Sequence, residues 1–229
     1  MLKFTPILLA ILYALAMYAV SAFRTKRELD ARSAELVDPR LTGHFDRLAK
    51  ALEVPRIKVM LYEIDAVNGL AAPDGRIFLT RGFYNKFRLG DVSGEELAAV
   101  VAHEIGHVAL GHSRKRLIDF SGQNALRTAL AVFLSRFIPG VGVWIANSVA
   151  TLLAARMSRD DEFEADAYAT ALLIKAGIGT APQKSLFRKL GALTSAGRAS
   201  IPAWFLSHPS AEARIAAIET NETRWHAAT

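Results

Sequence analysis

The sequence predicts an α+β fold that is mostly helical, with a small antiparallel sheet and an apolar helix at its N-terminus. Three observations carry this prediction: an uncharged stretch at residues 4–23, alternating apolar side chains at residues 57–64, and a long apolar helix that begins near Ser93. The 229 residues suffice for a domain with a sizeable core. We therefore expect one domain over residues 26–229, preceded by a separate segment, residues 1–25.

The N-terminal segment has the properties of a membrane anchor. As a helix rising ~1.5 Å per residue, the uncharged stretch would cross a hydrocarbon core of about 30 Å. The alternative is a cleaved secretory signal, since Lys3 precedes the stretch and Val20-Ser21-Ala22 resembles a cleavage site. More basic residues follow the stretch than precede it, which predicts a single-pass membrane protein with a cytoplasmic domain. If the segment is a signal, the domain is periplasmic or external instead.

Charge and cysteine content exclude several classes of function. The 28 basic and 22 acidic residues give a formal charge of +6, which favours an anionic membrane surface as a partner. The chain has no Gly-rich phosphate loop and no aromatic-and-basic motif, so we expect no nucleic-acid partner. The absence of cysteine excludes disulfides, thiolate ligands and thiol catalysis. A metal site in this protein would be built from histidine and carboxylate.

The remaining pattern predicts the other elements of the domain. Residues 26–53 have helical periodicity that is broken or bent near Asp38-Pro39, and extended pieces at residues 67–72 and 76–80 flank a Pro-Asp-Gly turn signal. These pieces complete the expected antiparallel sheet. Further helices are expected at about residues 158–176, 182–196 and 210–220.

A second apolar region spans residues 125–155. It is interrupted by Arg127, Arg136 and Pro139-Gly140, and neither half reaches twenty uncharged residues. We expect helices that lie on the membrane or cover the functional site. A re-entrant or short spanning hairpin and an ordinary core segment are the alternatives.

The central helix carries the first functional motif. Ser93 can cap this helix with Glu96 as its capping-box partner, and the helix continues through the sequence H-E-I-G-H. Because residues four apart lie about 40° from each other around the helix axis, His103 and His107 can bind one ion. Glu104 is displaced round the helix and can reach a metal-bound water. This is the H-E-x-x-H arrangement of zinc hydrolases with a glutamate base.

A catalytic zinc site needs a third protein ligand. The class with a third histidine at position 113 is excluded, because Ser113 stands there and Leu110 replaces the required glycine. The remaining candidate is an acidic helix in which Glu162 and Asp166 lie one turn apart. Glu162 can ligate zinc while Asp166 accepts the outer N–H of a ligand histidine and fixes its tautomer. The alternative is a solvated acidic helix face.

Residues 157–167 resemble the S-R-x-x-E-x-x-A-D motif of the HtpX-like zinc metallopeptidases, a family that includes prenyl-protein endopeptidases and periplasmic chaperone-proteases. The resemblance covers about residues 55–220. Its further matches are Asn68 with residues 75–82, the H-E-x-x-H motif, Gly111-His112, and His208-Pro209 followed by Arg214-Ile215. It implies a gluzincin metalloprotease fold with one zinc ion per chain, held by His103, His107 and Glu162.

The resemblance also implies a place for the substrate. Asn68, Gly69, Leu70 and Ala71 resemble part of the edge strand on which an extended peptide lies by backbone pairing. Two features depart from the family: Gly69 stands where an alanine is usual, and only one clear transmembrane segment is present. The substrate and the topology are therefore not transferred.

Three further positions lie in or near the matching motifs, and the first of them has two readings. His208 resembles a family position near the site and would stabilise the oxyanion, or it caps the last helix together with Pro209. Arg214 would help to stabilise the oxyanion by orienting the acidic motif. For His112, at a helix end after Gly111, we expect only a capping or helix-dipole role.

The function expected from these residues is zinc-dependent hydrolysis of internal peptide bonds, with Glu104 as the general base. The resemblance and the anchor suggest misfolded or membrane-associated proteins as substrates, as in protein quality control. Peptide or unfolded protein and membrane lipid are the expected partners, and no oligomeric state is indicated. The alternatives are a zinc-containing membrane chaperone or assembly factor that does not cut its clients, and a processing protease of narrow specificity.

Overall fold

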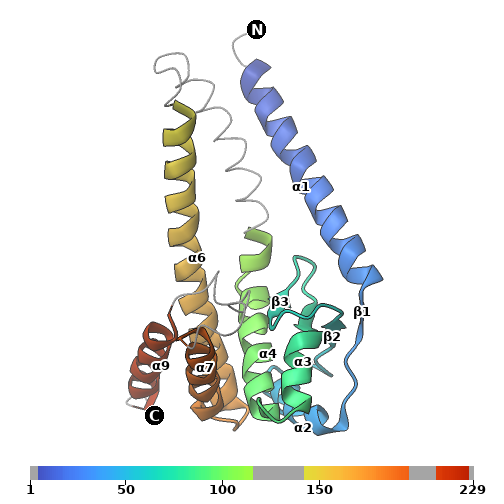
Figure 1. The fold of residues 1–229 in the computed structure, drawn as a ribbon, viewed down its shortest axis with the longest axis vertical. Helices are drawn as coiled ribbons and strands as arrows, with labels where there is room; N and C mark the ends of the chain where they lie inside the picture. The colour runs from blue at the N-terminus through green and yellow to red at the C-terminus, as the bar shows by residue number, and fades with distance from the viewer. Residues whose placement is uncertain (1–4, 116–141, 196–209, 227–229) are drawn as a thin grey trace.

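The computed structural model describes residues 5–115, 142–195 and 210–226 of the chain. Its helices are α1 (Thr5–Ala31), α2 (Pro39–Ala51), α3 (Arg81–Arg88), α4 (Gly94–Ala109), α6 (Gly142–Lys175), α7 (Ala181–Ser195) and α9 (Ala211–His226). Its strands are β1 (Ser33–Glu35), β2 (Val59–Tyr62), β3 (Gly69–Ala71) and β4 (Ile77–Thr80). Helix α4 lies between α6 and the sheet, and α7 and α9 pack near the C-terminal end of α6 (Figure 1).

The sheet is mixed, which corrects the expectation of an antiparallel sheet. Its strand order is β1-β2-β4-β3, with β2 and β4 parallel and the two outer pairs antiparallel. The Pro-Asp-Gly turn joins β3 to β4 as an antiparallel hairpin, as its sequence predicts. The hairpin then inserts β4 beside β2, so β3 becomes an edge strand. Alternation along a strand does not identify its neighbour, and the direction of this pair was therefore missed.

The break predicted near Asp38 separates α2 from a short strand. Asp38 is the N-cap of α2, and its Oδ1 accepts a hydrogen bond from the Arg40 backbone N–H at 2.9 Å. Hydrogen bonds from Arg40 hold the pKa of Asp38 well below its usual range, against the effect of burial. Strand β1, at residues 33–35, was expected to be helical. Its three residues gain their conformation from pairing with β2 rather than from a local pattern.

Helix α4 is the central element of the core. It begins with the predicted capping box: Ser93 Oγ accepts from the Glu96 N–H at 3.1 Å, and Glu96 Oε2 accepts from the Ser93 N–H at 2.7 Å. Every residue from Glu96 to His107 is buried. The helix ends at Ala109 before Gly111, whose φ of +73° reverses the chain. The polar residues of the H-E-x-x-H motif therefore lie inside the protein.

The glycine of the motif brings two helices together. A Cβ atom on Gly106 would lie 2.9 Å from the backbone oxygen of Ala165 and 3.1 Å from its Cα. Only a residue without a side chain allows α4 and α6 to approach so closely. This contact lies beside the acidic motif on α6, and it sets the spacing between the two halves of the candidate site.

The two apolar regions predicted from the sequence contribute to different helices, and only part of the second is described. Residues 142–155 of the second region form the beginning of α6, whereas residues 125–141 lie outside the described residues. The first region forms part of α1, which has 27 residues. Across the described ranges, no helix has both the length and the apolarity that crossing a membrane requires. The expected division of the chain into an N-terminal segment and a domain stays a prediction.

Candidate metal centre

Three buried side chains converge between α4 and α6. The Nε2 atoms of His103 and His107 lie 3.0 Å apart. The Glu162 carboxylate places Oε2 3.3 Å from the first of these nitrogens and Oε1 3.3 Å from the second. The three side chains are 3%, 3% and 0% exposed, so water does not screen them from one another. All three ligand atoms lie within 4.8 Å of one another.

This donor set fits a single zinc ion. Two imidazole nitrogens and one carboxylate oxygen form a usual set of protein ligands in a catalytic zinc site. Donors about 2.0–2.2 Å from a tetrahedral ion lie roughly 3.3 Å from each other, which is close to the separations found here. Both histidines use Nδ1 for other hydrogen bonds, so their Nε2 atoms face Glu162. Chemistry and spacing both suit the ion that the sequence predicts.

His103 is supported by an ion pair in the core. Its Nδ1 lies 2.9 Å from Oδ1 of Asp166. Arg214, from α9, donates to Asp166 through Nε and Nη2, both at 2.6 Å. Its guanidinium lies 4.2 Å from the Phe187 ring centroid. The structure thus brings Arg214 to the acidic motif, where its predicted role of orienting that motif requires it.

These contacts shift the pKa values of the buried groups. Burial alone would raise the pKa of Asp166, but Arg214 and His103 hold it below its usual range. Burial would lower the pKa of His103, but hydrogen bonds to Asp166 and Glu162 raise it to about 9. In the metal-free protein at neutral pH, a metal must therefore displace a proton from His103.

His107 is supported by a second hydrogen-bonded chain, which the sequence pattern did not predict. His107 Nδ1 lies 3.0 Å from His112 Nδ1, and His112 Nε2 lies 3.2 Å from Oε2 of Glu164. His112 accepts from the Nδ1–H of His107 when its own proton is on Nε2, which then donates to Glu164. His112 is 2% exposed, which argues against a simple capping role. The available signal was Gly111, whose positive φ folds the next residue back towards the last helical turn.

Glu104 lies against the edge strand. It is 3% exposed, and its Oε1 is 3.0 Å from the position of a Cβ atom on Gly69. Cγ1 of Val100 is 2.7 Å from the same position. A glycine here lets β3 pack directly on α4, which explains the departure from alanine noted in the sequence. The carboxylate of Glu104 is thereby held beside the backbone of β3.

Two residues of the edge strand β3, Gly69 and Ala71, turn their backbone N–H and C=O groups away from the sheet. Thr80 N–H donates to Asn68 O at 3.1 Å, and Ala72 N–H donates to Arg76 O at 2.8 Å, so residues 68 and 72 bond to the β4 side. Because hydrogen-bonded positions alternate along an antiparallel pair, the N–H and C=O groups of Gly69 and Ala71 point away from β4. No other described strand lies on that side.

Three of the predicted residues lack a described contact with the metal centre: His208, Asn68 and Leu70. His208 falls outside the described residues, so both of its readings stay predictions. The side-chain oxygen of Asn68 is buried without a hydrogen-bond partner among the described residues, although its backbone binds Thr80. Leu70 packs against a small cluster that contains Phe78.

Comparison with known proteins identifies similar sequences. The model of peptidase family M48 matches residues 35–222. Metalloprotease LoiP of Escherichia coli K12 is 30% identical over 175 residues, which cover 76% of this chain and 66% of LoiP. A protease HtpX homolog of Verminephrobacter eiseniae is 30% identical over 164 residues, covering 57% of this chain and 54% of the relative. The human mitochondrial metalloendopeptidase OMA1 is 26% identical over 171 residues, covering 71% and 32%. The matches thus span less than two thirds of these relatives' lengths.

Proposed function

Because the chain belongs to peptidase family M48, we propose that it is a zinc-dependent endopeptidase that hydrolyses internal peptide bonds. One observation carries the proposal: the buried cluster of His103, His107 and Glu162 lies beside an edge strand whose backbone faces outward. A peptide paired with that strand would pass next to the metal ligands and Glu104.

The three ligands have separate supports that orient them. His103 and His107 would hold zinc through Nε2, because Asp166 and His112 engage their Nδ1 atoms. Glu162, from α6, would provide the third ligand. Zinc held by these residues would supply Lewis acidity, for polarising the substrate carbonyl and making water more acidic.

Glu104 acts as the general base. It takes a proton from the attacking water and passes it to the nitrogen of the leaving amine. Its position against Gly69 keeps the carboxylate beside the strand that binds the peptide backbone. Burial in α4 limits the number of conformations that the carboxylate can adopt.

The substrate binds as an extended chain. Gly69 and Ala71 offer backbone N–H and C=O groups, which recognise any peptide irrespective of its side chains. A folded protein rarely presents an unpaired extended segment, so unfolded or misassembled proteins are the expected substrates. This is the basis for proposing a role in protein quality control.

We also propose that the protein associates with a membrane through α1. The support is the uncharged stretch at residues 4–23, followed by basic residues, together with exposed apolar side chains on α1, among them Leu15 and Phe23. Replacing Leu15 and Phe23 with aspartate should reduce flotation of the purified protein with anionic vesicles. Val37→Asp, at an exposed apolar residue outside α1, is the matched control. Equal flotation of all variants would reject α1 as the attachment site.

The catalytic proposal is tested by Glu104→Gln. We expect peptide hydrolysis to fall by about 10²–10⁴-fold, the usual contribution of a general base. The content of one zinc per chain should be unchanged, because Glu104 is not a ligand. Glu95→Gln, at an exposed glutamate of the same helix, should retain activity.

The ligand set is tested by Glu162→Ala, which should lose tight zinc binding as measured by metal analysis after dialysis. Full retention of zinc would require a different third ligand. If the purified, zinc-loaded protein binds unfolded clients and cleaves none of them, and Glu104→Gln keeps its cellular activity, the chaperone alternative replaces the protease.

A further inference from the structure

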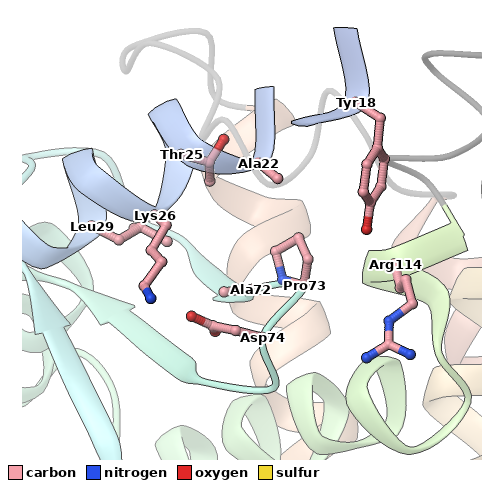
Figure 2. A pocket seen from close by; sticks show the side chains of 9 residues that line it. All are labelled: Tyr18, Ala22, Thr25, Lys26, Leu29, Ala72, Pro73, Asp74 and Arg114. Atoms are coloured by element: carbon pink, nitrogen blue, oxygen red, sulfur yellow. The ribbon is translucent and has the colours of Figure 1, made fainter. Parts of the chain in front are cut away.

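A cavity of about 390 Å³ separates α1 from the turn that follows β3 (Figure 2). One stripe of positions along α1 forms its first wall: Tyr18, Ala22, Thr25, Lys26 and Leu29. The opposite wall contains the turn residues 72–74 and Arg114. The volume is within the range of about 300–1,000 Å³ that is typical of small-ligand pockets. It is sufficient for a side chain and its flanking backbone.

The cavity adjoins the metal centre. A second cavity, of about 220 Å³, is lined by His107 and shares Ala72, Pro73, Asp74 and Arg114 with the first. Ala72 directly follows β3, so a peptide paired with β3 continues towards both cavities. Because an extended chain advances about 3.3 Å per residue, the larger cavity is within a few residues of the peptide positions held at β3.

The charges of the lining favour an acidic ligand. Lys26 and Arg114 approach from opposite walls, and neither forms an ion pair with another described residue. The carboxylate of Asp74 already accepts a hydrogen bond from Arg76 Nε at 2.8 Å. The lining therefore has an excess of positive charge. Its apolar surface includes Leu29, which can pack against the methylene groups of a bound side chain.

We infer that this cavity is a substrate subsite that takes an acidic side chain of the peptide, close to the bond that is cleaved. The inference rests on the proposed endopeptidase function and adds a preference to it. The proximity of His107 and of the end of β3 favours a peptide over a lipid phosphate as the occupant. Helix α1 lies outside residues 35–222, so the family match does not include this wall of the subsite.

The test reverses the charge of residues that line the cavity and varies the charge of the substrate side chain. Quenched peptides carry glutamate, lysine, alanine or leucine in turn at each of four positions on either side of the cleaved bond. At one position the wild-type enzyme should prefer glutamate over lysine in kcat/KM. Lys26→Glu and Arg114→Glu should each shift this ratio towards lysine by roughly two- to fivefold, the size of an exposed ion pair. The double variant should reverse the preference.

Two controls separate the subsite from general effects of charge. Arg88→Glu, at an exposed arginine of α3 that lines none of the described cavities, should leave the preference unchanged. Ala22→Trp adds no charge and fills the cavity from α1. It should reduce the advantage of glutamate at the same position while cleavage of the alanine peptide is retained.

The outcomes are distinguishable. Absence of any peptide cleavage by the zinc-loaded wild type overturns both the function and the subsite. Cleavage with an unchanged preference in the double variant overturns only the subsite. If the double variant also loses affinity for vesicles containing anionic phospholipid while its peptide preference stays unchanged, the cavity binds a lipid phosphate instead.

Discussion

The two histidines of the metal centre face the same ion position but are supported in different ways. His103 contacts Asp166, which is clamped by Arg214, and all three side chains are buried. His107 contacts His112, which leads to Glu164, and the Glu164 side chain is 63% exposed. The support of His103 is an ion pair within the core. The support of His107 leads to an exposed carboxylate at 3.2 Å from His112, with the buried Asp161 carboxylate farther away at 3.9 Å.

This difference indicates how much each support contributes. Removing one partner of a buried ion pair costs about 3–5 kcal/mol, because the other charge is left unpaired. An exposed ion contributes about 0–1 kcal/mol, because water competes for it. The residues that support His103 should therefore affect both the free energy of unfolding and the zinc affinity. The residues that support His107 should affect zinc affinity, with little effect on the free energy of unfolding.

The largest effect is expected for Asp166→Asn. The change leaves Arg214 buried without its carboxylate partner and weakens the acceptor for His103. We expect a loss of about 3–5 kcal/mol in the free energy of unfolding. Zinc affinity should fall by about 10–100-fold. Denaturant unfolding and chelator competition measure the two effects, with Asp160→Asn, an exposed position on the same helix, as the control. An affinity within twofold of the wild type would contradict the comparison.

The second effect is a pH dependence of the metal-free protein. The pKa of His103 is raised to about 9 in the folded state, against about 6.5 when unfolded. Its contribution to stability is therefore fully present below about pH 6.5 and is lost as the pH rises through 9. Melting temperatures in the presence of a chelator should fall across this window. Asp166→Asn should flatten the change, and an equal slope in both proteins would exclude His103 as its source.

A smaller effect is expected for His112→Leu, which removes the acceptor for the Nδ1–H of His107. Zinc affinity should fall by about tenfold, the lower end of the range for such supports. His112→Asn should restore part of the loss, because its side-chain oxygen can accept the same hydrogen bond. Chelator competition measures affinity, and nitrogen-15 NMR reports the His107 tautomer. Unchanged affinity in the leucine variant would mean that His112 serves only packing.

The smallest effect is expected for Glu164→Gln. The amide oxygen can still accept from His112, and the side chain is mostly exposed. The change in zinc affinity should stay within about fivefold, the size of a surface ion pair. If Glu164→Gln lost as much zinc affinity as Asp166→Asn in chelator competition, the supports of His103 and His107 would contribute equally to zinc binding. That result would contradict the proposed difference between them.

Local patterns predicted the elements that carry the candidate site. The capping box of Ser93 and Glu96 located the start of α4, and the Pro-Asp-Gly turn located the β3–β4 hairpin. The spacing of Glu162 and Asp166 predicted that both lie on one face of a helix. In the structure, both side chains lie at the candidate metal centre. The family match confirms the resemblance on which the zinc site was built. The catalytic and ligand roles of these residues stay predictions.

Features that depend on long-range packing were not predictable from the same patterns. The parallel pairing of β2 with β4 depends on where the hairpin docks, and β1 is too short to have a period of its own. The contact of His107 with His112 requires the chain reversal at Gly111. Arg214 lies 48 residues after Asp166, so only the family resemblance suggested a relation between them.

The place of Arg214 in the chain affects when the centre can form during synthesis. Arg214 follows His103 by 111 residues, and it belongs to α9. A ribosome that has already made both histidines and Glu162 has not yet made the cation that neutralises Asp166. Until α9 emerges and docks, Asp166 lacks the two hydrogen bonds that Arg214 donates to it. We therefore expect tight zinc binding only after translation has passed residue 214.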